Sequence, residues 1–175
     1  MGKKNENESK VVELARKAIE EYVLNGNQIK PPAELPEEMQ GKKGTFVSLK
    51  KNGNLRGCIG TTRPTQKNIA VEIIKNAINA CSHDPRFSPV QPDELDDLEI
   101  SVDILGEAEP VDSIDDLDPD QYGVIVKDGH HTGLLLPDLD GIDTARDQVN
   151  IARKKAGISP DQDLDLFRFE VHRFE

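Results

Sequence analysis

Two short segments of this chain repeat each other and restrict what it can fold into. "KNGNLRGCI" begins at Lys51 and "KDGHHTGLL" begins at Lys127, so that one lysine and two glycines recur with an offset of 76 residues. Asn-Gly and Asp-Gly tolerate the positive φ angles of tight hairpin turns. We therefore expect two β-hairpins. Apolar residues at helical spacing follow each of them, which indicates an internal duplication of a hairpin–helix unit.

Apolar spacing and capping residues predict three helices in all, and two single strands complete the pattern. A helix capped by Ser9 is expected to continue to about Asn25, the helix after the first hairpin is expected over residues 66–82, and the last helix ends at Ala156. The alternation in "LEISVDIL" and "DLFRFEVHRFE" predicts strands. This order favours an α+β fold with a largely antiparallel, barrel-like sheet flanked by helices.

Length and composition favour one domain of an intracellular protein. Residues 1–9 are expected to be disordered, and residues 10–175 are expected to form a single domain. The chain has no run of the roughly 18 apolar residues that a membrane span needs, and its first residues lack the apolar core of a signal peptide. Two cysteines make neither a disulfide framework nor a zinc signature. We therefore expect a cytoplasmic protein that binds no membrane.

Charge excludes one class of partner and suggests another. The net charge is -11, which argues against a nucleic-acid-binding protein, since such proteins need a basic surface. Residues 93–120 hold 13 acids and no Lys or Arg, whereas residues 42–75 hold eight Lys or Arg and one acid. Acidic runs are typical of solvated surface. The basic stretch is the part of the chain that would attract a small anionic ligand.

The segment "LRGCIG" lies in the basic stretch and leaves two interpretations of Cys58 open. On a strand, Arg56, Cys58 and Gly60 would share one face, and a guanidinium beside a thiol could lower the pKa of that thiol. Gly57 and Gly60 would let a ligand or another backbone approach closely. In the repeat, however, Leu134 takes the place of Cys58, so the position can also be simply apolar.

A nucleophilic thiol usually needs a base, and His83 is the candidate from the "HDPRF" loop. Asp84 and Arg86 stand beside it, and Phe87 is expected to fill a gap in the core. The adjacent pair His130 and His131 would point to opposite faces of a strand and chelate poorly. We therefore expect no bound metal, and the glycines form no phosphate-binding pattern that would indicate a nucleotide cofactor.

These segments resemble a known family. "LRGCIG", "DPRFSPV", "ELDDLEISVDIL" and "YGVIVKDGHHTGLLLP" are similar to the AMMECR domain family, whose bacterial and archaeal members are called AmmeMemoRadiSam system protein A; the likeness covers about residues 10–174. The resemblance implies two unequal lobes around a cleft, with "LRGCIG" at or near that cleft. It also implies a cytoplasmic protein with a functional link to a Memo-like protein, which resembles extradiol dioxygenases, and to a radical SAM protein.

Carried over residue by residue, the resemblance selects two patches of this chain. The first is the hallmark "LRGCIG" with its candidates Arg56, Gly57, Cys58 and Gly60, and the second is Asp84, Pro85, Arg86 and Phe87. The family's reaction is not settled, so the resemblance assigns no chemistry and implies no cofactor.

Two functions stay open on this basis. The first, which we favour, is an accessory module that binds a small ligand or a Memo-like or radical SAM partner, with the two patches as its binding residues. The second is a cleft enzyme that uses Cys58 as a nucleophile or redox thiol on a small anionic substrate. Arg56 would then support the thiolate and His83 would act as the base.

Overall fold

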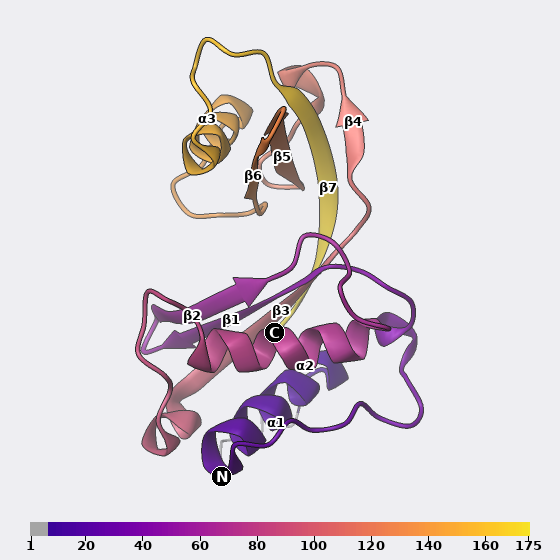
Figure 1. The fold of residues 1–175 in the computed structure, drawn as a ribbon, viewed down its shortest axis with the longest axis vertical. Coiled ribbons are helices and arrows are strands. Elements are labelled where there is room, and N and C mark those ends of the chain that lie inside the picture. Colours follow the sequence, from indigo (N-terminus) through magenta and orange to yellow (C-terminus); the bar gives the residue numbers. More distant parts are fainter. Residues whose placement is uncertain (1–6) are drawn as a thin grey trace. The chain divides into compact units, whose positions relative to one another are not determined.

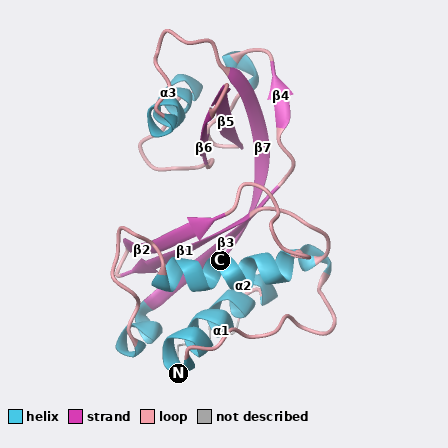
Figure 2. Ribbon diagram, viewed as in Figure 1, coloured by secondary structure: helices cyan, strands magenta, loops and turns pink. Residues whose placement is uncertain are grey.

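A computed structural model describes residues 7–175, which contain three α-helices and seven β-strands (Figures 1 and 2). The helices are α1 (Lys10–Asn25), α2 (Ile69–Ser82) and α3 (Ala145–Ala156). The strands are β1 (Thr45–Lys51), β2 (Asn54–Gly60), β3 (Leu98–Leu105), β4 (Glu109–Val111), β5 (Tyr122–Asp128), β6 (His131–Leu135) and β7 (Asp165–Phe174). The chain forms two compact units: unit 1 runs to Ile104 and includes Arg173–Glu175, and unit 2 is Leu105–His172.

Unit 1 is a three-stranded antiparallel sheet covered on one face by two helices (Figure 1). β1 is the central strand, with β2 on one side and β3 on the other. Val47 and Leu49 alternate with more exposed residues along β1 and point toward α2, whose apolar face packs on the sheet and on α1. The buried side chains of this core are mainly Ile, Val, Leu and Ala. The core is thus built from aliphatic residues, in keeping with the low aromatic content of the chain.

The first hairpin has the predicted turn, followed by a bulge that the sequence pattern does not predict. Asn52 and Gly53 have φ angles of 52° and 77°, as a tight hairpin turn requires. Beyond the turn the register shifts by one residue, so that Leu49 stands opposite Gly57 and Arg56 has no partner on β1. This β-bulge places Ser48, rather than its neighbour, opposite Cys58.

Unit 2 repeats the plan with a shorter helix. β5 pairs with β6 and β7 on its two sides, β4 adds to β7, and each of these pairings is antiparallel. Gly129, with φ 51°, lies in the turn between β5 and β6. α3 packs on β5 and β6 over a small apolar core that includes Val124, Val126 and Val149. The acidic linker after Pro110 contains one short helical turn, Ile114–Asp116.

The predicted duplication has a physical basis at two equivalent glycines. A Cβ on Gly57 would lie far inside the contact distance of the Ala80 carbonyl oxygen of α2, and a Cβ on Gly133 would overlap in the same way with the Ala152 carbonyl oxygen of α3. Gly57 and Gly133 are 76 residues apart, the offset of the sequence repeat. In each unit a helix backbone therefore rests directly on the second strand of a hairpin.

The structure confirms the predicted helix boundaries except the start of the second helix. The second helix begins at Ile69 and not at residue 66, because Asn68 accepts from the Val71 amide as its N-cap and Gln66 stays in the preceding loop. Ser9 caps α1 and Gly157 ends α3 as predicted. Of the stretch 1–9 expected to be disordered, residues 1–6 lie outside the described residues.

Within residues 7–175, no helix combines the length and the apolar character needed to cross a membrane. The mixed α+β class and the antiparallel pairing of the strands agree with the sequence prediction.

The contact at Gly57 gives a direct test of this packing. We expect Gly57→Ala to lower the free energy of unfolding by about 3 kcal/mol, because the new methyl group displaces α2 from β2. Gly129→Asn is the control: its surroundings are open, and Asn tolerates a positive φ. The control should stay within about 0.5 kcal/mol of the wild type in urea unfolding. Equal losses in both variants would contradict the packing explanation.

Candidate functional site

The hallmark segment forms β2, an edge strand of the unit 1 sheet. Gly57 and Ile59 face the helices, since Gly57 lies under α2 and Ile59 packs against the core. Cys58 faces the other way and lies in a cross-strand row with Ser48 on β1 and Ser101 on β3. The predicted alternation of the segment is therefore confirmed for Gly57, Cys58 and Ile59.

The Cys58 thiol is bonded and partly buried. Its Sγ lies 3.2 Å from Ser48 Oγ. Burial raises the pKa of the Cys58 thiol, and the lowering effects of the Ser48 hydrogen bond and the Arg86 charge do not cancel that rise. Asp103 and Asp84 raise the pKa further through their negative charges. A thiol with a raised pKa carries little thiolate at neutral pH, and the thiolate is the nucleophilic form.

The second patch holds the Cys58 peptide from outside the sheet. Asp84 Oδ2 accepts from the Cys58 amide at 3.0 Å, and Arg86 Nη2 donates to the Cys58 carbonyl oxygen at 3.3 Å. Asp84 and Arg86 also bond each other through two guanidinium nitrogens, at 3.0 and 2.8 Å. Together the pair satisfies the outward donor and acceptor of Cys58 as a neighbouring strand would. Hydrogen bonds from Arg86 hold the pKa of Asp84 well below its usual range, against the opposing effect of burial.

Arg56 is bound to an acid that the sequence analysis placed on the solvated surface. Its Nε and Nη2 donate to the two carboxylate oxygens of Glu94 at 3.0 Å each, and its Nη1 donates to the Ser88 carbonyl oxygen at 2.8 Å. Lys51 also pairs with Glu94 at 3.1 Å. Arg56 lowers the pKa of Glu94 to about 2, so the carboxylate stays charged at neutral pH. Two cations of the basic stretch are thus engaged within the protein.

The remaining predicted residues make contacts with other parts of unit 1. His83 is exposed, its Nδ1 lies 2.6 Å from Ser82 Oγ, and its ring stands 6.4 Å from the Tyr22 ring. Gly60 lies beneath the Phe46 ring, which a Cβ would overlap. Cys81 is buried on α2, where burial raises the pKa of its thiol to about 11. In the described part of the chain, the Cys58 thiol is bonded to Ser48, whereas the printed hydrogen bonds of Arg56 and His83 go to other groups.

The segment after the hallmark is fixed by a buried carboxylate. Glu72 on α2 accepts from the hydroxyls of Thr61 and Thr65, at 2.6 and 2.8 Å, and from the amides of Thr65 and Gln66, at 2.9 and 2.8 Å. Burial raises the pKa of Glu72, but these four donors outweigh that effect and leave the pKa lowered. Glu72 therefore fixes the residues that directly follow β2.

The sequence analysis missed Ser48, Glu94 and Glu72 as parts of this site. Ser48 would follow from the hairpin register only if the bulge were known. Glu94 stands in a run of acids, and neither its position nor its type separates it from its solvated neighbours. Among residues 7–175, no group of three or more His, Cys, Asp or Glu side chains could hold a metal ion.

An arginine next to an aromatic ring distinguishes this surface. The Arg86 side chain is 56% exposed although its guanidinium Nε and Nη2 donate to Asp84, whose side chain is 2% exposed. Its guanidinium carbon lies 5.4 Å from the centre of the Phe87 ring. Arg and aromatic side chains that are fixed in advance are common anchors of protein interfaces. The surface therefore exposes Arg86 beside Phe87, whereas the Cys58 thiol is partly buried.

The Asp84 clamp predicts a pH-dependent loss of stability. We expect Asp84→Asn to lower the free energy of unfolding by about 2 kcal/mol at pH 7, because an amide cannot replace a charged acceptor of four hydrogen bonds. The folded-state pKa of Asp84 is lowered, so its contribution is present above the unfolded pKa of about 4 and is lost as the pH falls below that value.

The measurement is urea unfolding of wild type and Asp84→Asn at pH 7 and at pH 3, with the exposed Asp120→Asn as control. The difference between wild type and Asp84→Asn should shrink at pH 3, whereas the control should match the wild type at both values. A difference that is independent of pH would mean that the Asp84 carboxylate charge does not hold the clamp.

The comparisons with known proteins agree with this architecture. A family model described as AMMECR1 matches residues 12–174. A protein of Thermotoga maritima is 52% identical in an alignment 167 positions long, which covers 94% of this chain and 96% of that protein. A protein of Clostridium acetobutylicum is 48% identical in an alignment 179 positions long, which covers 98% of this chain but 38% of that protein. The chain thus spans less than half the length of this second relative.

A solved structure supports the fold. The crystal structure of an uncharacterized protein from Pyrococcus horikoshii matches with a TM-score of 0.85 and 33% sequence identity, and covers 93% of this chain and 88% of that one. The family match extends over nearly the whole chain, and over the matched residues these proteins are 33% to 52% identical to it. The chain therefore belongs to the AMMECR1 family.

Proposed function

We propose that this chain is a non-catalytic accessory module that binds a partner protein through the surface around Arg86 and Phe87. The resemblance carried by the hallmark and its companion segments supplies the partners: a Memo-like protein and a radical SAM protein, with the cytoplasm as the place of action. A small ligand on the same surface is the narrower form of the proposal. Nucleic acid is not among the expected partners, because the net charge is -11.

The observation that carries the proposal is that the hallmark is bonded to the protein's own groups. The amide and carbonyl of Cys58 are held by Asp84 and Arg86, and Arg56 is held by Glu94. Groups that must bind and release a substrate during turnover are seldom used up in this way. A rigid support does favour partner binding, because fewer side chains lose freedom when the complex forms.

The Clostridium acetobutylicum relative is consistent with a module. In that protein the matched segment belongs to a much longer chain. A domain that occurs both alone and joined to other sequence is one that can work beside another domain. This supports the general role but leaves the identity of the partner to the resemblance.

The catalytic alternative depends on the state of Cys58. Its thiol is partly buried and bonded to Ser48, and its pKa is raised. The cation whose charge lowers that pKa is Arg86 rather than the expected Arg56. These features favour a thiol that stays protonated at neutral pH. A catalytic thiol would require a partner or substrate to change this environment.

Alkylation separates the two roles. In a Cys81→Ala background, we expect Cys58 to react with iodoacetamide with an apparent pKa above the ordinary value of about 8.5. Arg86→Ala should raise that pKa further, because it removes the positive charge beside the thiol. Arg56→Ala is the matched control and should leave it unchanged. An apparent pKa below the ordinary value that rises on Arg56→Ala would support the enzyme and count against the accessory role.

Partner binding is tested by calorimetry with the Memo-like and the radical SAM protein of the same genome. We expect Arg86→Gln to weaken binding about 30-fold, the effect of losing an interface anchor worth about 2 kcal/mol. Phe87→Ala should weaken it in the same direction without disturbing the Asp84 clamp. Lys75→Gln, an equal charge change at an exposed site on α2, is the control. Binding of neither partner, or equal losses in all three variants, would refute the proposal.

A further inference from the structure

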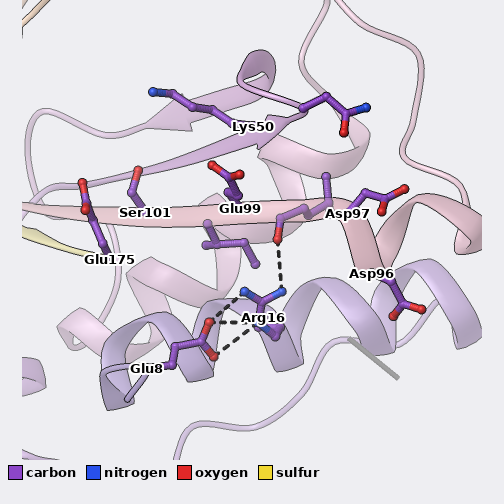
Figure 3. A pocket seen from close by; sticks show the side chains of 11 residues that line it. Glu8, Arg16, Lys50, Asp96, Asp97, Glu99, Ser101 and Glu175 are labelled. Carbon is purple, nitrogen blue, oxygen red and sulfur yellow. Dashed lines mark hydrogen bonds and ion pairs between the residues drawn. The ribbon is translucent and has the colours of Figure 1, made fainter. Parts of the chain in front are cut away.

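A groove of about 550 Å³ runs along β3 in unit 1 (Figure 3). It lies at the opposite edge of the three-stranded sheet from the hallmark, since β1 separates β3 from β2. Its walls come from the start of α1, the end of β1, the first half of β3, and Glu175. It shares no residue with the surface around Arg86, so a function of this groove is independent of the proposed function.

The pairing pattern shows which backbone groups face this groove. The amide and carbonyl of Cys58 point away from β1. Ser48, its cross-strand partner on β1, therefore points its own amide and carbonyl toward β3, where it pairs with Ser101. Ile100, one residue earlier on β3, must then turn its amide and carbonyl away from β1. Leu98 confirms the alternation, because its carbonyl oxygen accepts from Arg16 Nη1 on α1 at 3.4 Å.

β7 occupies only part of this edge. Arg173 and Asp103 pair side by side through two hydrogen bonds, at 2.8 and 3.1 Å, which sets the position of β7 beside β3. This ion pair lies in the second half of β3. The first half of β3, residues 98–101, lines the groove itself, so its outward edge faces the groove. Such an edge is a template for the addition of an extended chain.

The charges that line the groove favour a basic ligand. Carboxylates of Glu8, Asp97, Glu99 and Glu175 line it, with Asp96 as a fifth acid, whereas the cations among the described residues that line it are Arg16 and Lys50. Arg16 is bound by Glu8 at 2.7 Å, so that pair is neutral (Figure 3). An acidic peptide would be repelled, and a basic one would be attracted.

We propose that the groove along β3 binds an extended basic segment of a partner protein, which adds as a strand in line with β7. Its backbone would pair with the amide and carbonyl of Ile100, and its Lys or Arg side chains would meet Glu99 and Glu175. The Leu98 carbonyl would exchange its bond to Arg16 for one to the added strand. Main-chain pairing supplies affinity in this mode, and the flanking side chains supply specificity.

The probe is a fluorescein-labelled peptide of alternating lysine and valine, about seven residues long to match a typical strand, titrated at near-physiological salt and followed by anisotropy. Two further peptides carry N-methyl groups either on every lysine or on every valine, which blocks the amides of one strand edge and leaves the charge unchanged. An added strand uses only one edge, so we expect one methylated peptide to lose roughly tenfold or more in affinity and the other to bind like the parent.

A second measurement locates the pairing on the protein. Hydrogen exchange of the Ile100 amide should slow roughly tenfold or more when the parent peptide is bound. Glu99→Gln should weaken binding several-fold, whereas Glu107→Gln, an equal charge change in unit 2, should not. Equal affinities of the two methylated peptides, or binding without protection of Ile100, would mean that a basic peptide merely adheres to an acidic protein, and would overturn the proposal.

Discussion

The close contact between a helix backbone and the second strand of each hairpin is the constraint on which the rest of the structure depends. Gly57 lets α2 rest on β2, and Gly133 lets α3 rest on β6, at equivalent positions of the two units. With the helix fixed on one face, the alternation of the strand decides what the other face presents. Gly57 faces α2, so Cys58 lies on the opposite face of β2, where its Sγ contacts Ser48 Oγ.

The consequence for the hallmark is that much of its composition has a structural reason. Gly57 makes room for α2, Gly60 for the Phe46 ring, and the Cys58 peptide is held by Asp84 and Arg86. A motif of this kind need not mark a reaction centre, because each residue is required to bring two distant segments together. What is left exposed is the product of that assembly, the Arg86 side chain with the Phe87 ring.

Much of the fold could be predicted from local chemistry, and the site could be predicted only in part. The turn at Asn52-Gly53, the cap at Ser9 and the stop at Gly157 each depend on residues within a few positions of one another. The bulge at Arg56 depends on how β2 fits against β1 and α2 together, and no neighbouring residue signals it. Arg56 is the residue left without a partner on β1, and its side chain bonds Glu94, which stands 38 residues away in the sequence.

The outward backbone groups of β2 and β3, the two outer strands of the unit 1 sheet, differ in how they are hydrogen-bonded, and this difference bears on function. At β2 an ion pair from the 84–86 loop satisfies the outward amide and carbonyl of Cys58, so no strand can add there without displacing it. At β3 the Leu98 carbonyl oxygen accepts one hydrogen bond, from Arg16 Nη1 at 3.4 Å, and a groove lined by carboxylates lies beside it. Edges left open invite unwanted pairing, and proteins normally close them with charge or cover. An edge kept open beside a shaped, acidic groove is therefore better understood as a place for a defined basic strand.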